Sequence, residues 1–190
     1  MLLLDKRLLF IHIPKCAGTS IEVFFTGRDW TEINPRTKHL TAQEAVRTYG
    51  REVWDQCFTF SVVRNPWGRL LSFFNLVRTV KPKVVFDDWI RQICSPQGLR
   101  FMGVPVHLSM TEYLSGPDGK LMVEFVGKFE SLSEDFRVIA ERAGCSSGEL
   151  PRRMVSPKYD RNYRKWYTPV TRDLVGQRFR EDVERFGYDY

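Results

Sequence analysis

The sequence contains no long hydrophobic run and no clustered cysteines. No stretch approaches the ~18 uninterrupted apolar residues of a membrane-spanning helix, and the leucines after Met1 are followed by charged residues too soon for a signal peptide. The four cysteines lie far apart, without the C-x-x-C spacing of zinc and redox sites, so we expect reduced, mostly buried thiols. These absences predict a soluble protein, and we expect it to be cytoplasmic.

The chain also lacks a strong excess of charge of either sign. Its 29 Lys and Arg against 23 Asp and Glu give a net charge of +6, which suits an anionic ligand but is too small and dispersed to predict nucleic acid as a partner. An ordinary soluble surface explains the charge equally well. With 190 residues, 43% of them hydrophobic, and no linker or internal repeat, we expect one domain over residues 1–190.

Strand and helix patterns alternate along the chain. Strands are expected at Arg7 to Ile13, Phe58 to Val63 and Leu121 to Val126. Helices are expected at Ser20 to Thr26, Thr41 to about Tyr49, Trp67 to about Thr79 after an Asn65 cap, Asp87 to Cys94, Ser131 to about Ala143, and Thr168-Pro169 to Phe186. Thr41 and Ser131 each open a capping box, and Gly98 to Met110 reads as a loop. The alternation predicts an α/β fold with a mostly parallel central sheet flanked by helices.

The segment from Pro14 to Ser20, PKCAGTS, leads from the first expected strand into the first helix. A helix N-terminus offers unpaired N–H groups and a positive dipole end, and both favour a phosphate. Gly18 permits close backbone approach, Thr19 and Ser20 add hydroxyl donors, and the ammonium of Lys15 can reach over the bound group. A nucleoside-triphosphate loop instead ends in Gly-Lys-Ser/Thr and works with magnesium, for which no Asp-ended strand offers an obvious second ligand. Taken alone, the segment is also compatible with a capped helix and a chance lysine.

A second strand-to-helix junction, VVRNPWGRLLS, runs from Val62 to Ser72. Arg64 follows the second strand, at the edge where open α/β sheets bind ligands, and Ser72 comes two helical turns later, able to face the same crevice. An arginine fork with a hydroxyl makes a second phosphate site, although an exposed arginine at an ordinary junction is the alternative. The two junctions together predict a ligand with two separated phosphate-like groups.

This ordered pair of motifs resembles the 5′- and 3′-phosphate-binding elements of sulfotransferases that use 3′-phosphoadenosine 5′-phosphosulfate (PAPS). In that family Pro-Lys-x-x-Gly-Thr-Ser holds the 5′-phosphosulfate, and Arg with Ser eight residues later holds the 3′-phosphate, the spacing of Arg64 and Ser72. Further similarity to the carbohydrate-type and bacterial branch, family 2, is found in KHLT from Lys38, FVGKFE from Phe125, NYRKWY from Asn162 and FGY from Phe186. The resemblance therefore spans nearly the whole chain.

The resemblance implies a P-loop NTPase-like sulfotransferase fold and the transfer of a sulfuryl group from PAPS without a metal. The product would be 3′,5′-phosphoadenosine (PAP), and the acceptor a hydroxyl or an amine, with a carbohydrate hydroxyl favoured. It further implies that Lys15 stabilises the leaving oxygen, that Gly18, Thr19 and Ser20 hold the 5′-phosphate, and that Arg64 and Ser72 hold the 3′-phosphate.

The catalytic base is expected to be a histidine or a carboxylate, and the chain has three histidines. The segment from Lys38 to Thr41 resembles the one that carries the base in uronyl-type sulfotransferases, so His39 is the candidate, with a structural or substrate-orienting role as the alternative. His12 reads as a satisfied strand residue, and His107 lies in a loop where nothing else supports a role.

The segment from Lys158 to Tyr167 is basic and aromatic and is placed by the resemblance over the nucleotide. Arg161, Arg164 and Lys165 could contact the 3′-phosphate, and Trp166 or a neighbouring tyrosine could stack on adenine. A solvated basic loop anchored by its aromatics is the alternative.

Two other functions remain open for the whole chain. A P-loop-like nucleotide kinase would bind ATP with magnesium, and the missing Gly-Lys-Ser/Thr ending argues against it. A non-catalytic nucleotide-binding regulator would keep the fold without transferring a group, and the presence of Lys15 and His39 argues against that.

Overall fold

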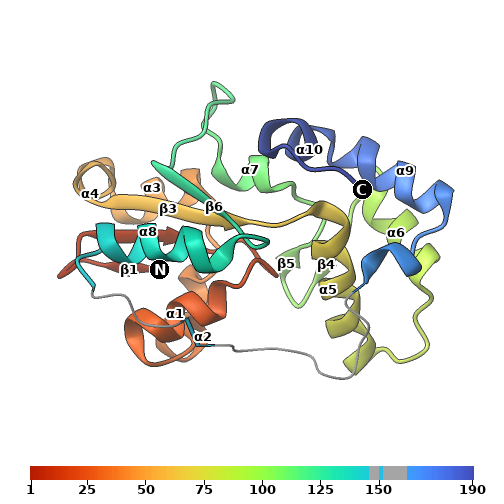
Figure 1. Cartoon of the computed structure of the whole chain (residues 1–190), viewed down its shortest axis with the longest axis horizontal. Coiled ribbons are helices and arrows are strands. Elements are labelled where there is room, and N and C mark those ends of the chain that lie inside the picture. Colours follow the sequence, from red (N-terminus) through yellow and green to blue (C-terminus); the bar gives the residue numbers. More distant parts are fainter. Residues whose placement is uncertain (146–149, 152–161) are drawn as a thin grey trace. The chain divides into compact units, whose positions relative to one another are not determined.

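The structure, a computed structural model, describes residues 1–145, 150–151 and 162–190 (Figure 1). It divides the chain into two compact units. Of the described residues, the first unit contains Met1–Val63, 110–145 and 150–151, and the second contains Arg64–Ser109 and 162–190. Each unit is therefore assembled from segments that lie far apart in the sequence.

A four-stranded sheet, ordered β1-β2-β3-β6, forms the centre of the first unit. Its strands are β1 (Leu2–Leu3), β2 (Leu8–Ile11), β3 (Phe58–Val63) and β6 (Phe125–Lys128). β2 and β6 both pair with β3 in parallel, whereas β1 pairs antiparallel with β2. The predicted mostly parallel sheet is thus confirmed, with β1 as an addition that is too short to show a period in the sequence.

Burial explains why these segments are strands. All four residues of β2 are buried, and so are five of the six residues of β3, which is typical of parallel strands covered on both faces. Phe10 of β2 lies opposite Phe60 of β3 in register, and their rings stack with centroids 4.9 Å apart. The ring of Phe25 also packs against that of Phe60, with ring centroids 6.5 Å apart. Aromatic packing thus fixes the strand that leads to the predicted phosphate loop.

Helices flank this sheet. They are α1 (Gly18–Thr26), α2 (Trp30–Ile33), the 3₁₀ helix η1 (Pro35–Thr37), α3 (Ala42–Tyr49), α4 (Arg51–Gln56), α7 (Met110–Leu114) and α8 (Leu132–Arg142). α8 packs against β6, and its Phe136 meets Phe24 of α1 edge to face at 4.8 Å. The predicted capping box of Thr41 is confirmed, because its hydroxyl accepts from Glu44 N and the Glu44 carboxylate accepts from Thr41 N.

The second unit is mainly helical. It contains α5 (Pro66–Val80), α6 (Phe86–Cys94), β4 (Arg100–Phe101), β5 (Val104–Pro105), the 3₁₀ helix η2 (Tyr163–Lys165), α9 (Pro169–Arg178) and α10 (Arg180–Phe186). Its core gathers the apolar faces of α5, α6 and α9, with Phe74 against Phe86 at 4.9 Å and against Trp89 at 5.4 Å. In the part of the chain that the structure describes, no helix is both long and apolar enough to cross a membrane.

Several element boundaries differ from the sequence predictions. The strand expected at Leu121 to Val126 begins only at Phe125, since Leu121 instead bridges back to Ser115 beside the turn. The single C-terminal helix is broken at Phe179, which is buried in the core with non-helical dihedral angles. The loop predicted from Gly98 to Met110 contains the small β4–β5 hairpin.

The prediction of a capping box at Ser131 is also wrong. The Ser131 hydroxyl does not accept a hydrogen bond from the first turn of α8 but donates to the carboxylate of Asp135 at 2.7 Å. That carboxylate simultaneously accepts from Lys128 N at 2.7 Å. Asp135, and not Glu134, therefore ties the end of β6 to the start of α8.

Candidate functional site

The phosphate loop predicted between β2 and α1 has an unusual backbone. Lys15 and Ala17 both have left-handed dihedral angles, with φ of 70° and 63°, and Cys16 lies between them without a positive φ. Such alternation turns successive N–H groups toward one concave side, which is how backbone nests hold anions. Ala17 is the N-cap of α1 and offers no side-chain cap bond. The loop thus has the form of an anion cradle at the start of a nine-residue helix.

Gly18 is required here for a reason that the sequence did not reveal. A Cβ at Gly18 would lie 2.1 Å from both Cδ2 and Nε2 of His12. The missing side chain therefore makes room for a buried imidazole, in addition to any approach of the backbone to a ligand.

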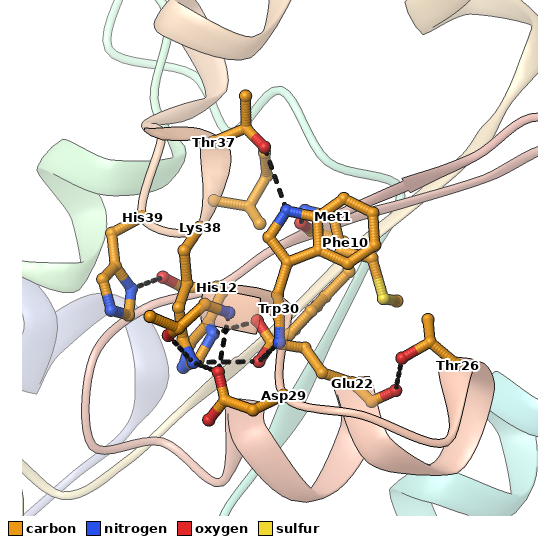
Figure 2. Close-up of polar contacts among 12 residues, drawn as sticks. Met1, Phe10, His12, Glu22, Thr26, Asp29, Trp30, Thr37, Lys38 and His39 are labelled. Carbon is orange, nitrogen blue, oxygen red and sulfur yellow. Dashed lines mark hydrogen bonds and ion pairs between the residues drawn. The ribbon is translucent and has the colours of Figure 1, made fainter. Parts of the chain in front are cut away.

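Behind the loop, Glu22 collects polar contacts from three segments, as Figure 2 shows. Its side chain is fully buried, and its Oε1 accepts from His12 Nδ1 at 2.5 Å. Its Oε2 accepts from Trp30 N at 3.2 Å and lies 3.2 Å from Lys38 Nζ. Lys38 also donates to Asp29 and, at 2.9 Å, to the hydroxyl of Thr31.

These contacts set the charge states of the cluster. Burial alone would raise the pKa of Glu22, but the hydrogen bond from His12 and the nearby Lys38 ammonium outweigh it and lower that pKa. The pKa of Asp29 is lowered to about 2, since the bonds from Lys38 and Thr31 outweigh its desolvation. Burial lowers the pKa of His12, so this ring is neutral near pH 7 and donates Nδ1–H to an ionised Glu22.

His39 is held beside this cluster. Its Nδ1 lies 3.0 Å from the carbonyl oxygen of His12, which can only accept, so Nδ1 carries the proton. The two imidazoles meet edge to face at 4.4 Å. Burial, and secondarily the charge of a protonated His12, lower the pKa of His39 to about 3. Within the described residues Nε2 makes no hydrogen bond, so a neutral ring presents its lone pair there.

The second predicted phosphate site begins at Arg64, directly after β3. Asn65 caps α5 as predicted, with its side-chain oxygen accepting from the N–H groups of Trp67 and Gly68 at 3.1 and 3.3 Å. A Cβ at Gly68 would lie 3.5 Å from the Tyr163 ring and 3.6 Å from Arg64 Nε. The Arg64 side chain and the tyrosine ring thus both lie beside Gly68 in the first turn of α5, and Ser72 follows Gly68 by one turn on the same helix face.

The basic and aromatic segment is described from Asn162 onward, so Arg161 lies outside the described residues. Arg164 and Lys165 are exposed on η2, where the Arg164 guanidinium lies over the Tyr163 ring at 5.0 Å. Trp166 packs against Phe86 at 5.7 Å, inside the aromatic core of the second unit. The aromatic anchoring is therefore observed, while contacts with a nucleotide stay a prediction.

The predicted residues fall into two sets. Lys15, Gly18, Thr19, Ser20 and His39 belong to the first unit, where Lys15 and Thr19 are partly exposed. The second unit holds the predicted 3′-phosphate residues Arg64, Ser72, Arg164 and Lys165, together with Trp166, which was predicted as a possible adenine-stacking residue.

Sequence reasoning missed Glu22, Asp29 and the side chain of Lys38. One signal was readable: Glu22 follows Gly18 by four residues, so both lie on the helix face that meets His12. The aromatic residues Trp30, Trp54 and Tyr113 are buried in the core of the first unit.

Comparison with known proteins bears on these two sets of residues. No curated protein and no solved structure matches the chain significantly. A family model described as "Sulfotransferase family" matches residues 4–189 and so covers both phosphate motifs, His39 and the C-terminal segment. With nearly its whole length matched, the chain belongs to the sulfotransferase family.

Proposed function

We propose that the protein transfers a sulfuryl group from PAPS to a hydroxyl group, with carbohydrate hydroxyls as the favoured acceptors. Family membership supports sulfuryl transfer in general. The observation that carries the specific proposal lies in the first unit: a left-handed loop bearing Lys15 opens α1, and a neutral histidine, His39, is bonded to the strand segment that precedes this loop.

The reaction is an in-line displacement at sulfur. The acceptor oxygen attacks, the bond between sulfur and the bridging oxygen of the 5′-phosphate breaks, and PAP leaves with the electron pair. Charge accumulates on the bridging oxygen, so positioning and electrostatic stabilisation supply most of the acceleration, as in phosphoryl transfer. Lys15 is assigned to that oxygen, and the backbone of Gly18 to Ser20 to the 5′-phosphate.

His39 is assigned to take the acceptor proton at Nε2. The Nδ1–H bond to His12 fixes the tautomer in which Nε2 is the acceptor. With a pKa of about 3 the ring is neutral but weakly basic. An anionic donor bound nearby favours the imidazolium form and raises that pKa toward the range in which a general base is effective.

The 3′-phosphate is assigned to Arg64 and Ser72, with Arg161, Arg164 and Lys165 as additional cations. Two features support this. β2 and β3 are neighbouring parallel strands, so the segments that follow them leave the sheet at the same edge, where α/β proteins bind ligands. Arg64 and the ring of Tyr163 also both lie beside Gly68 at the start of α5, which is compatible with a cation and an aromatic side chain serving one ligand.

A thermal-shift titration tests the donor assignment. PAP and ATP are each titrated with and without magnesium, against wild type and the variant Arg64→Ala. We expect PAP to stabilise the wild type without metal and to stabilise Arg64→Ala much less. Stabilisation by magnesium–ATP alone would contradict the proposal and favour a kinase.

Transfer itself is tested with labelled PAPS and a panel of sugar, phenol and amine acceptors. We expect label in at least one sugar hydroxyl. Binding of PAP without transfer to any acceptor class would instead favour a nucleotide-binding regulator.

A further inference from the structure

Glu22 occupies a position that demands an explanation. Its carboxylate is completely buried, one helical turn after the first residue of α1. It bonds to His12 beyond β2, to the start of α2 at Trp30, and to Lys38 next to His39 (Figure 2). One side chain thus joins the phosphate-loop helix to both chain segments that hold His39.

Stability alone is a weak reason for such a group. Burying a carboxylate and an ammonium removes both from water, and apolar residues of similar volume often serve a core as well or better. The cluster here contains two carboxylates, Glu22 and Asp29, around the ammonium of Lys38. Buried charged networks of this kind hold their members in one geometry, because every donor has a specific acceptor.

That geometry leads directly to His39. Glu22 pins the His12 imidazole through Nδ1, while the Gly18 backbone blocks the opposite edge of the same ring. The carbonyl of His12 then accepts Nδ1–H of His39. On the other side of His39, its chain neighbour Lys38 is held by Glu22 and Asp29. The Glu22 carboxylate therefore takes part in both supports of His39 and shares the second with Asp29.

We propose that Glu22 is a positioning residue, which fixes His12 and Lys38 so that His39 keeps its proton on Nδ1 and presents Nε2 as an acceptor. The catalytic consequence rests on the function proposed above, in which His39 is the base. The placement of the His39 proton does not rest on that function and can be measured separately.

Glu22→Gln is the informative change. Glutamine has the same shape, but only one of its two terminal atoms accepts a hydrogen bond, whereas Glu22 accepts from His12 with one oxygen and meets Trp30 N and Lys38 with the other. One of these contacts must be lost. The double variant Glu22→Gln, Lys38→Met removes both buried charges and controls for a general loss of stability; it also stands in if the single variant does not fold.

The first readout is the protonation site of each histidine by ¹⁵N–¹H NMR of the imidazole rings in the full chain. The chain has three histidines, and His107, whose Nδ1 lies 3.0 Å from Leu99 O in the second unit, is the internal control. We expect all three rings to carry Nδ1–H in the wild type. In Glu22→Gln we expect His39 to show a mixture of Nδ1–H and Nε2–H forms, with His107 unchanged. An unchanged His39 spectrum in both variants would overturn the proposal.

The second readout is kinetic. We expect Glu22→Gln to lower kcat by about tenfold or more, with PAP affinity within about threefold of wild type, since a supporting partner acts on the base more than on donor binding. Recovery of both kcat and stability in the double variant would show a purely structural role and also overturn the proposal. A shifted His39 tautomer with normal kcat would support positioning by Glu22 but remove His39 as the base. Absence of transfer by the wild type contradicts the proposed function and leaves the NMR result to decide on Glu22.

Discussion

Replacing Gly18 by alanine gives the sharpest test of the packing behind the phosphate loop. The added Cβ would lie 2.1 Å from two atoms of the His12 ring and 2.5 Å from a third, well inside the roughly 3.5–4.0 Å of an ordinary carbon contact. The ring has little room to retreat, because it is bonded to Glu22 at 2.5 Å and stacked on Phe10 at 5.6 Å. Overpacking costs about 1–3 kcal/mol, and loss of a hydrogen bond to a buried charge about 1.5–3. We therefore expect Gly18→Ala to destabilise by about 3–5 kcal/mol.

Urea unfolding of four proteins checks this value: wild type, Gly18→Ala, His12→Ala and the double variant. Removing the ring removes the three atoms nearest to the added methyl group, so Gly18→Ala should then be neutral or stabilise the fold slightly, by up to about 1 kcal/mol. Gly176→Ala in α9 is the matched control, because its Cβ would approach Trp67 only to 3.4 Å. Equal costs of Gly18→Ala in both His12 backgrounds would refute the explanation and return Gly18 to a role in ligand approach alone.

Three further predictions concern other parts of the first unit. The lowered pKa of His39, about 3 against 6.5, means that the unfolded chain gains a proton there as the pH falls while the folded chain does not, so stability is lost between about pH 6.5 and 3. In urea titrations, lowering the pH from about 7.5 to 4.5 should reduce the free energy of unfolding of His39→Asn, which keeps a donor, by about 2–3 kcal/mol less than that of the wild type. Equal reductions in the two proteins would contradict the lowered pKa of His39. Lys15→Ala should lower turnover roughly 10²-fold in the sulfate-transfer assay, with the exposed Lys6→Ala as control; a near-normal rate removes Lys15 from the mechanism. Thr41→Ala should lower the free energy of unfolding in urea by about 1 kcal/mol, and Thr41→Ser should lower it much less. Equal stability of Thr41→Ala and wild type would show that the capping box contributes nothing.

Local signals were sufficient for much of the fold. β3 spans the predicted Phe58–Val63, and α5 starts at the predicted cap because Asn65 and Pro66 act within one turn. The box at Thr41 likewise involves only residues three apart. Sequence alone failed at Ser131, because its hydroxyl donates to the carboxylate of Asp135 and does not cap the backbone of α8.

The parts that sequence reasoning missed depend on contacts across the chain. The spacing of Glu22 from Gly18 indicates a shared helix face, but it does not reveal the partners His12 and Lys38, which lie ten or more residues away. Phe179 ends α9 within a sequence whose apolar residues keep a helical spacing, because its side chain is buried in the core. For the site, the motifs indicated where a phosphate could bind, but the reason for Gly18 and the anchoring of His39 required the packed structure.

The short strand β1 has a consequence for the order in which the sheet forms. Leu3 pairs with Leu8, so the β1–β2 hairpin needs only a small loop, whereas Leu8 meets Phe58 and Phe60 meets Phe125 across long stretches of chain. Local pairs form faster than distant ones, and an open strand edge is a template for association with other chains. We expect β1 to pair with one edge of β2 before β3 does so on the other edge. This early pairing shortens the time in which the apolar strand β2 can associate with other molecules.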